Sequence, residues 1–237
     1  KAEIDLDPAE AKDNEKVYAR SAANWQAMVK DGIVVQDEAP ALYIYRLTMN
    51  GNQQYGLAAG CSVDEYVDGR IKKHEFTRPV KEGDRVRQIE ALNAQTGPVF
   101  LVYPSAPAVD AVLARETAAP PQVDVAAADG VRHELWTVVD AATLATLTAG
   151  FDALPALYVA DGHHRYETCL AYRDWRRGQE ADPPAVMPCD YTMMYITNME
   201  SPGLCVYPAH RILRTFEGRD PEAFLRTVAE TFSVTEV

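Results

Sequence analysis

The sequence lacks the features that define several large classes of protein. Its 237 residues contain 4 Cys, and none of them has the paired C-x-x-C spacing of a zinc or redox site. It has no apolar run of about eighteen residues and no signal-peptide pattern, so we expect no membrane partner and a cytoplasmic location. It also lacks a P-loop, a dinucleotide glycine fingerprint and a nucleophile elbow, which argues against the standard NTPase and hydrolase classes. We expect reduced thiols in the core at Cys61, Cys169, Cys189 and Cys205.

Positive charge is also scarce. The 23 Lys and Arg residues stand against 35 Asp and Glu, which gives a formal net charge of −12. Proteins that track a nucleic-acid backbone gain most of their affinity by neutralising phosphates, so nucleic acid is a disfavoured partner. A fraction of 47% hydrophobic residues is that of a folded globular protein with a substantial core.

The pattern of apolar residues alternates between helical and strand-like periods. Spacing over residues 13–30 predicts a helix that ends before Gly32, and Asn50-Gly51 predicts a tight hairpin between 42–47 and 55–59. The mixture predicts an α/β or α+β fold, a mixed sheet with flanking helices. Further helices are predicted to begin at Ser62, by a capping box, and at Pro79, and to cover 109–113, 141–147, 166–175 and 221–232. Further strands are predicted at 99–103, 123–128, 133–139, 157–160, 191–197, 204–207 and 232–237.

The ends of the chain predict its domain organisation. It begins at Lys1 and stops within the strand-like run 232–237, so we expect residues 1–237 to be one compact fragment of a longer protein. Two sub-domains are predicted within it. The first, 1–119, holds a helix, a hairpin and a basic segment, and the second, 120–237, holds the phosphate turn described next.

The sharpest candidate site is the turn between the predicted strand 157–160 and the following helix. A helix N-terminus presents unpaired N–H groups and the positive end of its dipole, and it therefore binds anions. Gly162 lets the backbone approach a ligand closely, and Arg165 has a planar fork that matches phosphate oxygens. Asp161 is a helix cap or a ligand for the Mg²⁺ that accompanies a polyphosphate. The alternative is that Asp161 only caps the helix and that His163 and His164 are surface residues.

A second candidate is the basic segment from Arg70 to Arg85, which places six Lys and Arg side chains within sixteen residues of an acidic chain. Some of these side chains could contact phosphates, and Glu75 or Glu82 could act as a base. The alternative is a solvated charged segment whose ion pairs contribute little to stability.

Together the two motifs resemble those of one bacterial family. Residues 71–78 (IKKHEFTR) and 158–165 (YVADGHHR) look like segments of a large family with a domain of unknown function, whose members often carry the label Spo0J/ParA/ParB/RepB family protein. The resemblance covers most of the chain. It implies a longer parent protein.

The turn from Asp161 to Arg165 is also similar to the signature turn of the ParB/sulfiredoxin superfamily, which binds nucleotide phosphates at a helix N-terminus. It resembles most the Asp-Gly-His-x-Arg turn of the free-serine kinases. His163 stands where sulfiredoxins have their essential Cys, and only Gly162 and Arg165 match the ParB turn. No helix-turn-helix module follows. The resemblance therefore implies a ParB/sulfiredoxin-like portion of the fold around this turn, without sulfiredoxin chemistry and without clear support for chromosome partitioning.

The function implied is a nucleotide-binding, Mg²⁺-dependent phosphotransferase that uses ATP or ADP and acts on a small hydroxylated metabolite, such as serine or phosphoserine. Its alternatives are a non-catalytic sensor of a nucleotide or phospho-metabolite and a ParB-like partition protein. Glu75 is the expected catalytic base, and Asp161 has a metal-binding or acid/base role. The expected phosphate contacts are Gly162, His163, His164, Arg165, Lys73, His74 and Arg78.

Overall fold

A computed structural model describes residues 5–7, 9–10, 14–76, 79–207, 218 and 220–235, which belong to two units, Lys1–Leu204 and Cys205–Val237. The helices are α1 (Asn14–Lys30), α2 (Asp64–Val67), α3 (Pro79–Leu92), α4 (Pro107–Glu116), α5 (Ala141–Asp152), α6 (His163–Gly178) and α7 (Pro221–Ala229), with a 3-10 turn at Pro188–Asp190. The strands are β1 (Leu42–Met49), β2 (Asn52–Ser62), β3 (Ile71–Lys72), β4 (Val99–Tyr103), β5 (Val123–Ala126), β6 (Arg132–Val138), β7 (Leu157–Asp161) and β8 (Tyr191–Asn198).

The strands form one sheet in the order β3-β7-β4-β8-β2-β1-β6-β5. The pairs β3–β7 and β4–β8 are parallel, whereas β1–β2, β1–β6, β2–β8, β4–β7 and β5–β6 are antiparallel. The predicted α/β fold with a mixed sheet and flanking helices is therefore confirmed. The sheet takes strands from both sides of residue 119, and the predicted division into sub-domains there stays a prediction.

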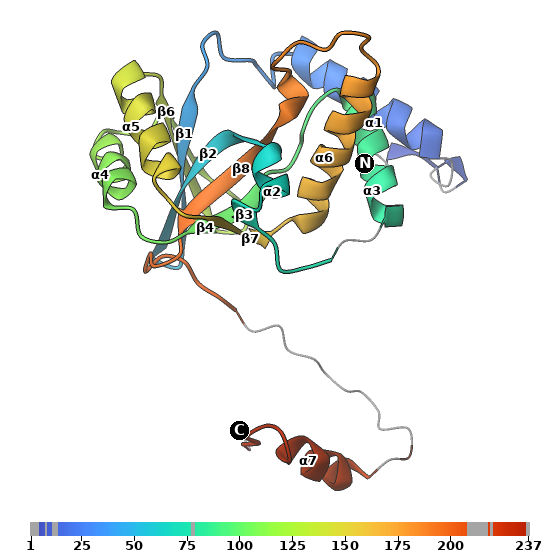
Figure 1. The fold of residues 1–237 in the computed structure, drawn as a ribbon, viewed down its shortest axis with the longest axis vertical. Coiled ribbons are helices and arrows are strands. Elements are labelled where there is room, and N and C mark those ends of the chain that lie inside the picture. The colour runs from blue at the N-terminus through green and yellow to red at the C-terminus, as the bar shows by residue number, and fades with distance from the viewer. Residues whose placement is uncertain are drawn as a thin grey trace. The chain divides into compact units, whose positions relative to one another are not determined.

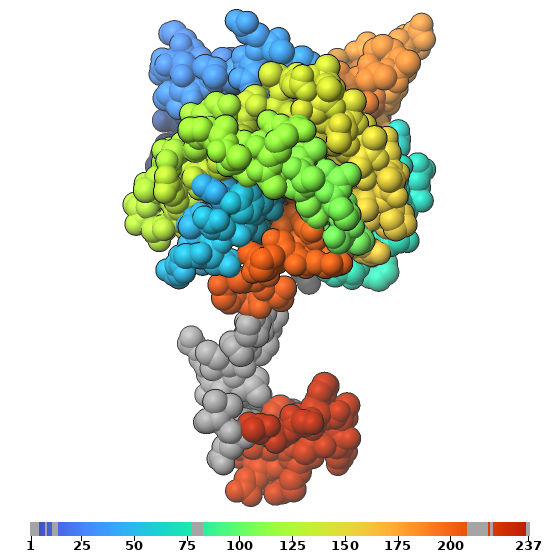
Figure 2. Space-filling model, turned by 90° about the vertical axis from the view of Figure 1, so that its left-hand side faces the viewer, coloured from blue at the N-terminus to red at the C-terminus, as the bar shows by residue number. Residues whose placement is uncertain are grey.

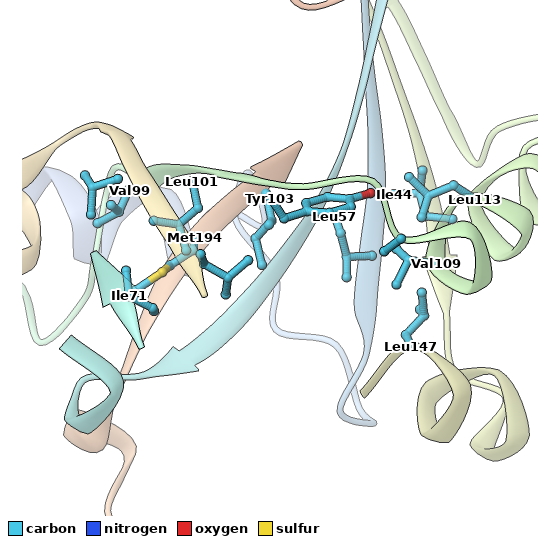
Figure 3. Packing of buried hydrophobic residues seen from close by; sticks show 14 of the residues in the cluster. Ile44, Leu57, Ile71, Val99, Leu101, Tyr103, Val109, Leu113, Leu147 and Met194 are labelled. Atoms are coloured by element: carbon cyan, nitrogen blue, oxygen red, sulfur yellow. The ribbon is translucent and has the colours of Figure 1, made fainter. Parts of the chain in front are cut away.

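Apart from the short α2, the helices of the first unit form two groups beside the sheet, α4 with α5 and α1 with α3 and α6 (Figure 1). One cluster of buried side chains joins the sheet to both groups. Along β4, Val99, Leu101 and Tyr103 are buried while the residues between them are half-buried, the alternation expected when one face of a strand packs on a core. Figure 3 shows this cluster extending from Ile71 at one end to Leu147 at the other.

The β1–β2 hairpin turns at Asn50 and Gly51, which both have positive φ, as the sequence predicts. Its tip lies beside the turn that follows β8 (Figure 2). Asn52 Nδ2 donates a hydrogen bond to the Gly203 carbonyl there (2.8 Å). A Cβ on Gly203 would lie 1.7 Å from the Gln53 carbonyl oxygen, so this close approach of two backbones requires glycine.

Three local predictions are wrong. Residues 204–207 are not a strand, because no described strand lies beside them to complete a ladder and Val206 is 90% exposed. The described part of 232–237, up to residue 235, is not a strand either. The expected capping box at Ser62 does not form, since the N-cap of α2 is Val63 and Ser62 Oγ instead accepts a hydrogen bond from the Asp64 N–H (3.2 Å).

All four cysteines are without disulfides, as predicted, but only Cys169 is fully buried and Cys205 is exposed. The expectation of four core thiols therefore holds only in part. Within the described residues, no helix has the length and apolar character needed to cross a membrane.

Candidate functional site

The short parallel pair β3–β7 brings the two sequence motifs together. Ile71 pairs with Leu157 and Lys72 pairs with Tyr158, so both strands end at the same edge of the sheet. The chain leaves β3 into residues 73–76 and leaves β7 into the turn that begins α6. Carboxyl ends of neighbouring parallel strands are a common place for ligand sites in α/β proteins.

The turn after β7 has the geometry expected from its sequence. Gly162 is the N-cap of α6 and has φ 96°, a left-handed conformation that favours glycine. A Cβ on Gly162 would lie 2.8 Å from Arg165 Nε, because the Arg165 side chain folds back over the turn. Arg165 Nη2 donates to Asp161 Oδ2 (2.7 Å), and this ion pair holds the guanidinium beside the helix N-terminus.

His163 is the point at which the two motifs meet. Its side chain is only 2% exposed, and its Nδ1 lies 3.5 Å from Glu75 Oε2. Its Nε2 accepts a hydrogen bond from the His74 N–H (3.4 Å), and the two imidazole rings meet edge to face at 4.5 Å. Since Nε2 accepts this bond, the proton of the neutral ring resides on Nδ1 and faces the Glu75 carboxylate.

The charge state of His163 follows from its surroundings. Burial lowers the pKa of the His163 imidazole below its ordinary value, and neighbouring His74 acts in the same direction. Glu75 and Asp161 act against them with smaller effects on that pKa. His163 is therefore neutral near pH 7, and its Nδ1 faces the Glu75 carboxylate at 3.5 Å; the Glu75 side chain is 57% exposed and accessible to a ligand.

Lys73 makes contacts that were not predicted from the sequence. Its Nζ lies 3.1 Å from Glu167 Oε1 and 4.6 Å from the centre of the Tyr66 ring, and Tyr66 Oη donates to the same carboxylate oxygen (2.8 Å). Glu167 had no predicted role. The spacing of four residues from His163 would have placed it on the same helix face.

The other predicted residues have different outcomes. The carbonyl of His164 accepts a hydrogen bond from Thr168 Oγ1 (2.5 Å), and the residue is half-buried at the start of α6. Arg78 lies outside the described residues. The structure thus places His74 and Glu75 against the turn from Asp161 to Arg165, whereas Lys73, just before them in the chain, contacts α6 one turn further on. We call these eight residues the turn cluster.

The turn cluster could bind a magnesium ion through one carboxylate, with the nucleotide supplying the other ligands. Among the residues that the structure describes, no group of three or more His, Cys, Asp or Glu could hold a metal ion. Mg²⁺ in phosphoryl-transfer sites needs only one or two carboxylates, because phosphates and water complete its coordination. Asp161, with a side chain 74% exposed, could supply one carboxylate to an ion carried by a nucleotide.

Comparison with known proteins gives one match. A family model described as "Protein of unknown function (DUF1015)" matches residues 1–237. No curated protein and no solved structure matches the chain. The description of the matched family does not mention partition proteins, so the Spo0J/ParB label in the resemblance is not supported.

Proposed function

We propose a function for this chain, which belongs to the DUF1015 family. The turn cluster binds the phosphates of ATP or ADP, and a phosphoryl group is transferred from the nucleotide to a small hydroxylated metabolite. The observation that carries this proposal is the contact between Glu75 and His163 across the parallel pair β3–β7. It places an accessible carboxylate beside the N-terminus of a long helix. Phosphoryl transfer requires two contributions from a protein, a proton acceptor and a cradle of donor groups that stabilises negative charge.

The cradle consists of backbone and side-chain donors. The first-turn N–H groups of α6 have no carbonyl in a preceding turn, and the helix dipole favours an anion there. Gly162 leaves the backbone uncovered by a side chain, and Arg165 lies directly over it. A bound phosphate would compete with Asp161 for the Arg165 guanidinium and would release the Asp161 carboxylate toward a nucleotide-borne Mg²⁺.

The reaction requires one proton acceptor. The acceptor hydroxyl oxygen forms a bond to the terminal phosphorus, and the bond between that phosphorus and the bridging oxygen breaks. The shortened nucleotide leaves with the bonding electron pair, and the hydroxyl proton passes to the Glu75 carboxylate. His163 acts as a positioning residue, because its Nδ1–H holds Glu75 at the mouth of the turn. Mg²⁺, when bound, neutralises charge on the phosphates.

The finer features of the fold are part of this proposal. We propose that the portion from β7 through α6 is ParB/sulfiredoxin-like, on the strength of the strand, left-handed glycine and helix around Asp161 to Arg165. A closely related alternative is a sensor that binds the same nucleotide without turnover. The phosphate contacts offered by the turn, the first N–H groups of α6 and Arg165, serve this alternative equally well, because binding alone needs no proton acceptor.

Calorimetric titration of the protein with ATP, ADP and CTP in the presence of Mg²⁺ tests the binding site. Arg165→Ala should weaken nucleotide binding by about tenfold or more, since a charge-assisted hydrogen bond is lost. Arg176→Ala, on the same helix and paired with Glu180, is the matched control and should bind as the wild type does. Equal binding by wild type and Arg165→Ala would remove the turn from the site.

Turnover separates the enzyme from the sensor. Glu75→Gln should keep nucleotide affinity and lower kcat about 10²- to 10⁴-fold, because the proton acceptor is lost while the charge cradle remains. Phosphate transfer to serine and other small alcohols is measured by the nucleotide product formed. Full turnover by Glu75→Gln would exclude Glu75 as the base, and binding without any turnover in the wild type would establish the sensor.

A further inference from the structure

A cavity of about 510 Å³ lies at the opposite edge of the sheet from the turn cluster. It adjoins the carboxyl ends of the parallel pair β4–β8, where Tyr103 pairs with Asn198 and both side chains line the cavity. Because β4 runs antiparallel to β7, these ends point away from the carboxyl ends of β3 and β7. Each of the two parallel pairs therefore has its own candidate ligand site.

Three segments that are far apart in the sequence form the walls of this cavity. Tyr55 comes from β2, Asp110 from α4 and Asn198 from the end of β8, and the turn after β8 closes one side. Figure 2 shows the β1–β2 hairpin, α4 and this turn on one face of the molecule. The hydrogen bond between Asn52 and the Gly203 carbonyl holds the turn against the hairpin tip. The walls are therefore fixed by the fold of the first unit.

Asp110 is held where these walls meet. Tyr103 Oη donates to its Oδ1 and Asn198 Nδ2 donates to its Oδ2, each at 3.0 Å. The Glu200 N–H donates to Asn198 Oδ1 (2.8 Å), which orients this amide with its donor toward Asp110. A carboxylate oxygen has two lone pairs, so each oxygen of Asp110 can accept a further hydrogen bond from a ligand.

The cavity holds negative charge that no cation balances. Asp110 and Glu200 both line it, whereas no Lys or Arg does. Among the residues that the structure describes, neither carboxylate forms an ion pair. Arg46, which lies over the Tyr55 ring, is paired with Glu134 instead. Asp110 is half-buried, and a charge that is partly removed from water is usually paired, so a cationic ligand would supply the missing partner.

The size and the walls of the cavity favour an organic cation over a metal ion. No group of three or more His, Cys, Asp or Glu within the described part of the chain could hold a metal ion. The volume lies within the range for small-molecule sites. Tyr55, Leu113 and Pro202 add apolar surface, and a tyrosine ring also attracts ammonium and guanidinium groups.

We infer that this cavity binds a small organic cation, an alkylamine or guanidinium compound. Its charged group pairs with Asp110 and Glu200, and its hydrocarbon part lies against Leu113 and Pro202. The same two carboxylates repel anionic ligands, which separates this site from the turn cluster in the class of molecule it binds. The inference is independent of the proposed function.

Calorimetric titration of the protein with putrescine and agmatine tests the inference. The neutral matched probe is 1,4-butanediol, which keeps the hydrocarbon chain of putrescine and has hydroxyls in place of its amines. We expect both cations to bind and 1,4-butanediol to bind at least about tenfold more weakly, because it lacks the charge. Binding of the cations should also weaken as the salt concentration rises.

Asp110→Asn and Glu200→Gln each remove one charge with little change in size. Each should weaken binding of both cations by about tenfold or more. Glu116→Gln is the matched control, because Glu116 lies on α4, pairs with Arg115 and does not line the cavity. The Glu200 side chain is exposed and bonds to none of the described residues, so Glu200→Gln stays informative if Asp110→Asn fails to fold.

Three results would overturn the inference. The first is that neither cation binds at concentrations up to about 10 mM. The second is that 1,4-butanediol binds as tightly as the cations, which would show that the cavity does not select charge. The third is that cation binding is unchanged in both Asp110→Asn and Glu200→Gln, which would place the cation site elsewhere on the protein.

Discussion

At the residue scale, His163 shows how a polar side chain can be nearly completely buried at a candidate site. Both of its ring nitrogens have a neighbour, Glu75 at Nδ1 and the His74 N–H at Nε2. These contacts reduce the free-energy cost of burying an imidazole, which is high for a polar group without partners. Burial also disfavours the charged form and so lowers the pKa of His163.

The lowered pKa of His163 predicts a loss of stability in acid. Below the ordinary imidazole value of 6.5 the unfolded chain binds a proton that the native His163 resists, so the free energy of unfolding falls as the pH drops from there toward the lowered native value. His163→Gln removes this effect. Urea unfolding at about pH 7.5 and about pH 5.5 should therefore show a smaller acid-induced loss for the variant than for the wild type. Equal losses would show that His163 titrates normally in the folded protein.

At the scale of elements, the Tyr195 ring on β8 packs over Gly56 on β2 and occupies the space that a side chain at residue 56 would fill. A Cβ on Gly56 would lie 2.2 Å from the Tyr195 ring and 2.8 Å from Thr197 Oγ1, distances that require the ring to move. The same ring also meets Tyr45 of β1 edge to face, with centroids 5.9 Å apart. Gly56 is therefore the space into which an aromatic side chain from a neighbouring strand fits.

Gly56→Ala should lower the free energy of unfolding by about 1–3 kcal/mol, because the added methyl group overpacks the site. Gly60→Ala is the matched control on the same strand, since its Cβ would meet only Tyr191 Cβ at 3.6 Å. Its effect should stay within about 0.5 kcal/mol. Thermal or urea unfolding of both variants measures the difference, and similar stabilities would mean that the Tyr195 ring adjusts freely.

Elements with strong local signals were predictable from the sequence, whereas the arrangement that builds the candidate site was not. Asn50-Gly51 and Pro79 mark a turn and a helix start by their own backbone preferences, and both are confirmed. The two-residue strand β3 is too short to show a period, and its segment appeared only as a charged stretch. The contact between Glu75 and His163 depends on the pairing of β3 with β7, which joins residues far apart in the chain and has no local pattern.

At the scale of the whole molecule, the net charge of −12 predicts which partners will not bind. Duplex DNA should show no shift in a gel assay at physiological salt, because an acidic surface releases few counterions and repels the phosphate backbone. The matched measurement is the same assay at low salt, where a local basic patch would have its strongest effect. Tight binding at physiological salt would return a partition-type function to consideration.

Because β3 lies at the edge of the sheet, we expect it to open locally before the central strands do. β3 is the last strand in the sheet order and pairs with β7 through two residue pairs. Glu75 lies in the segment that directly follows it. Short ladders at sheet edges open locally at a lower free-energy cost than global unfolding. The amides of Ile71 and Lys72 should therefore exchange with solvent faster than those of the central strands. A ligand that spans Glu75 and the start of α6 would close this edge, so hydrogen exchange at two backbone amides would report on assembly of the site.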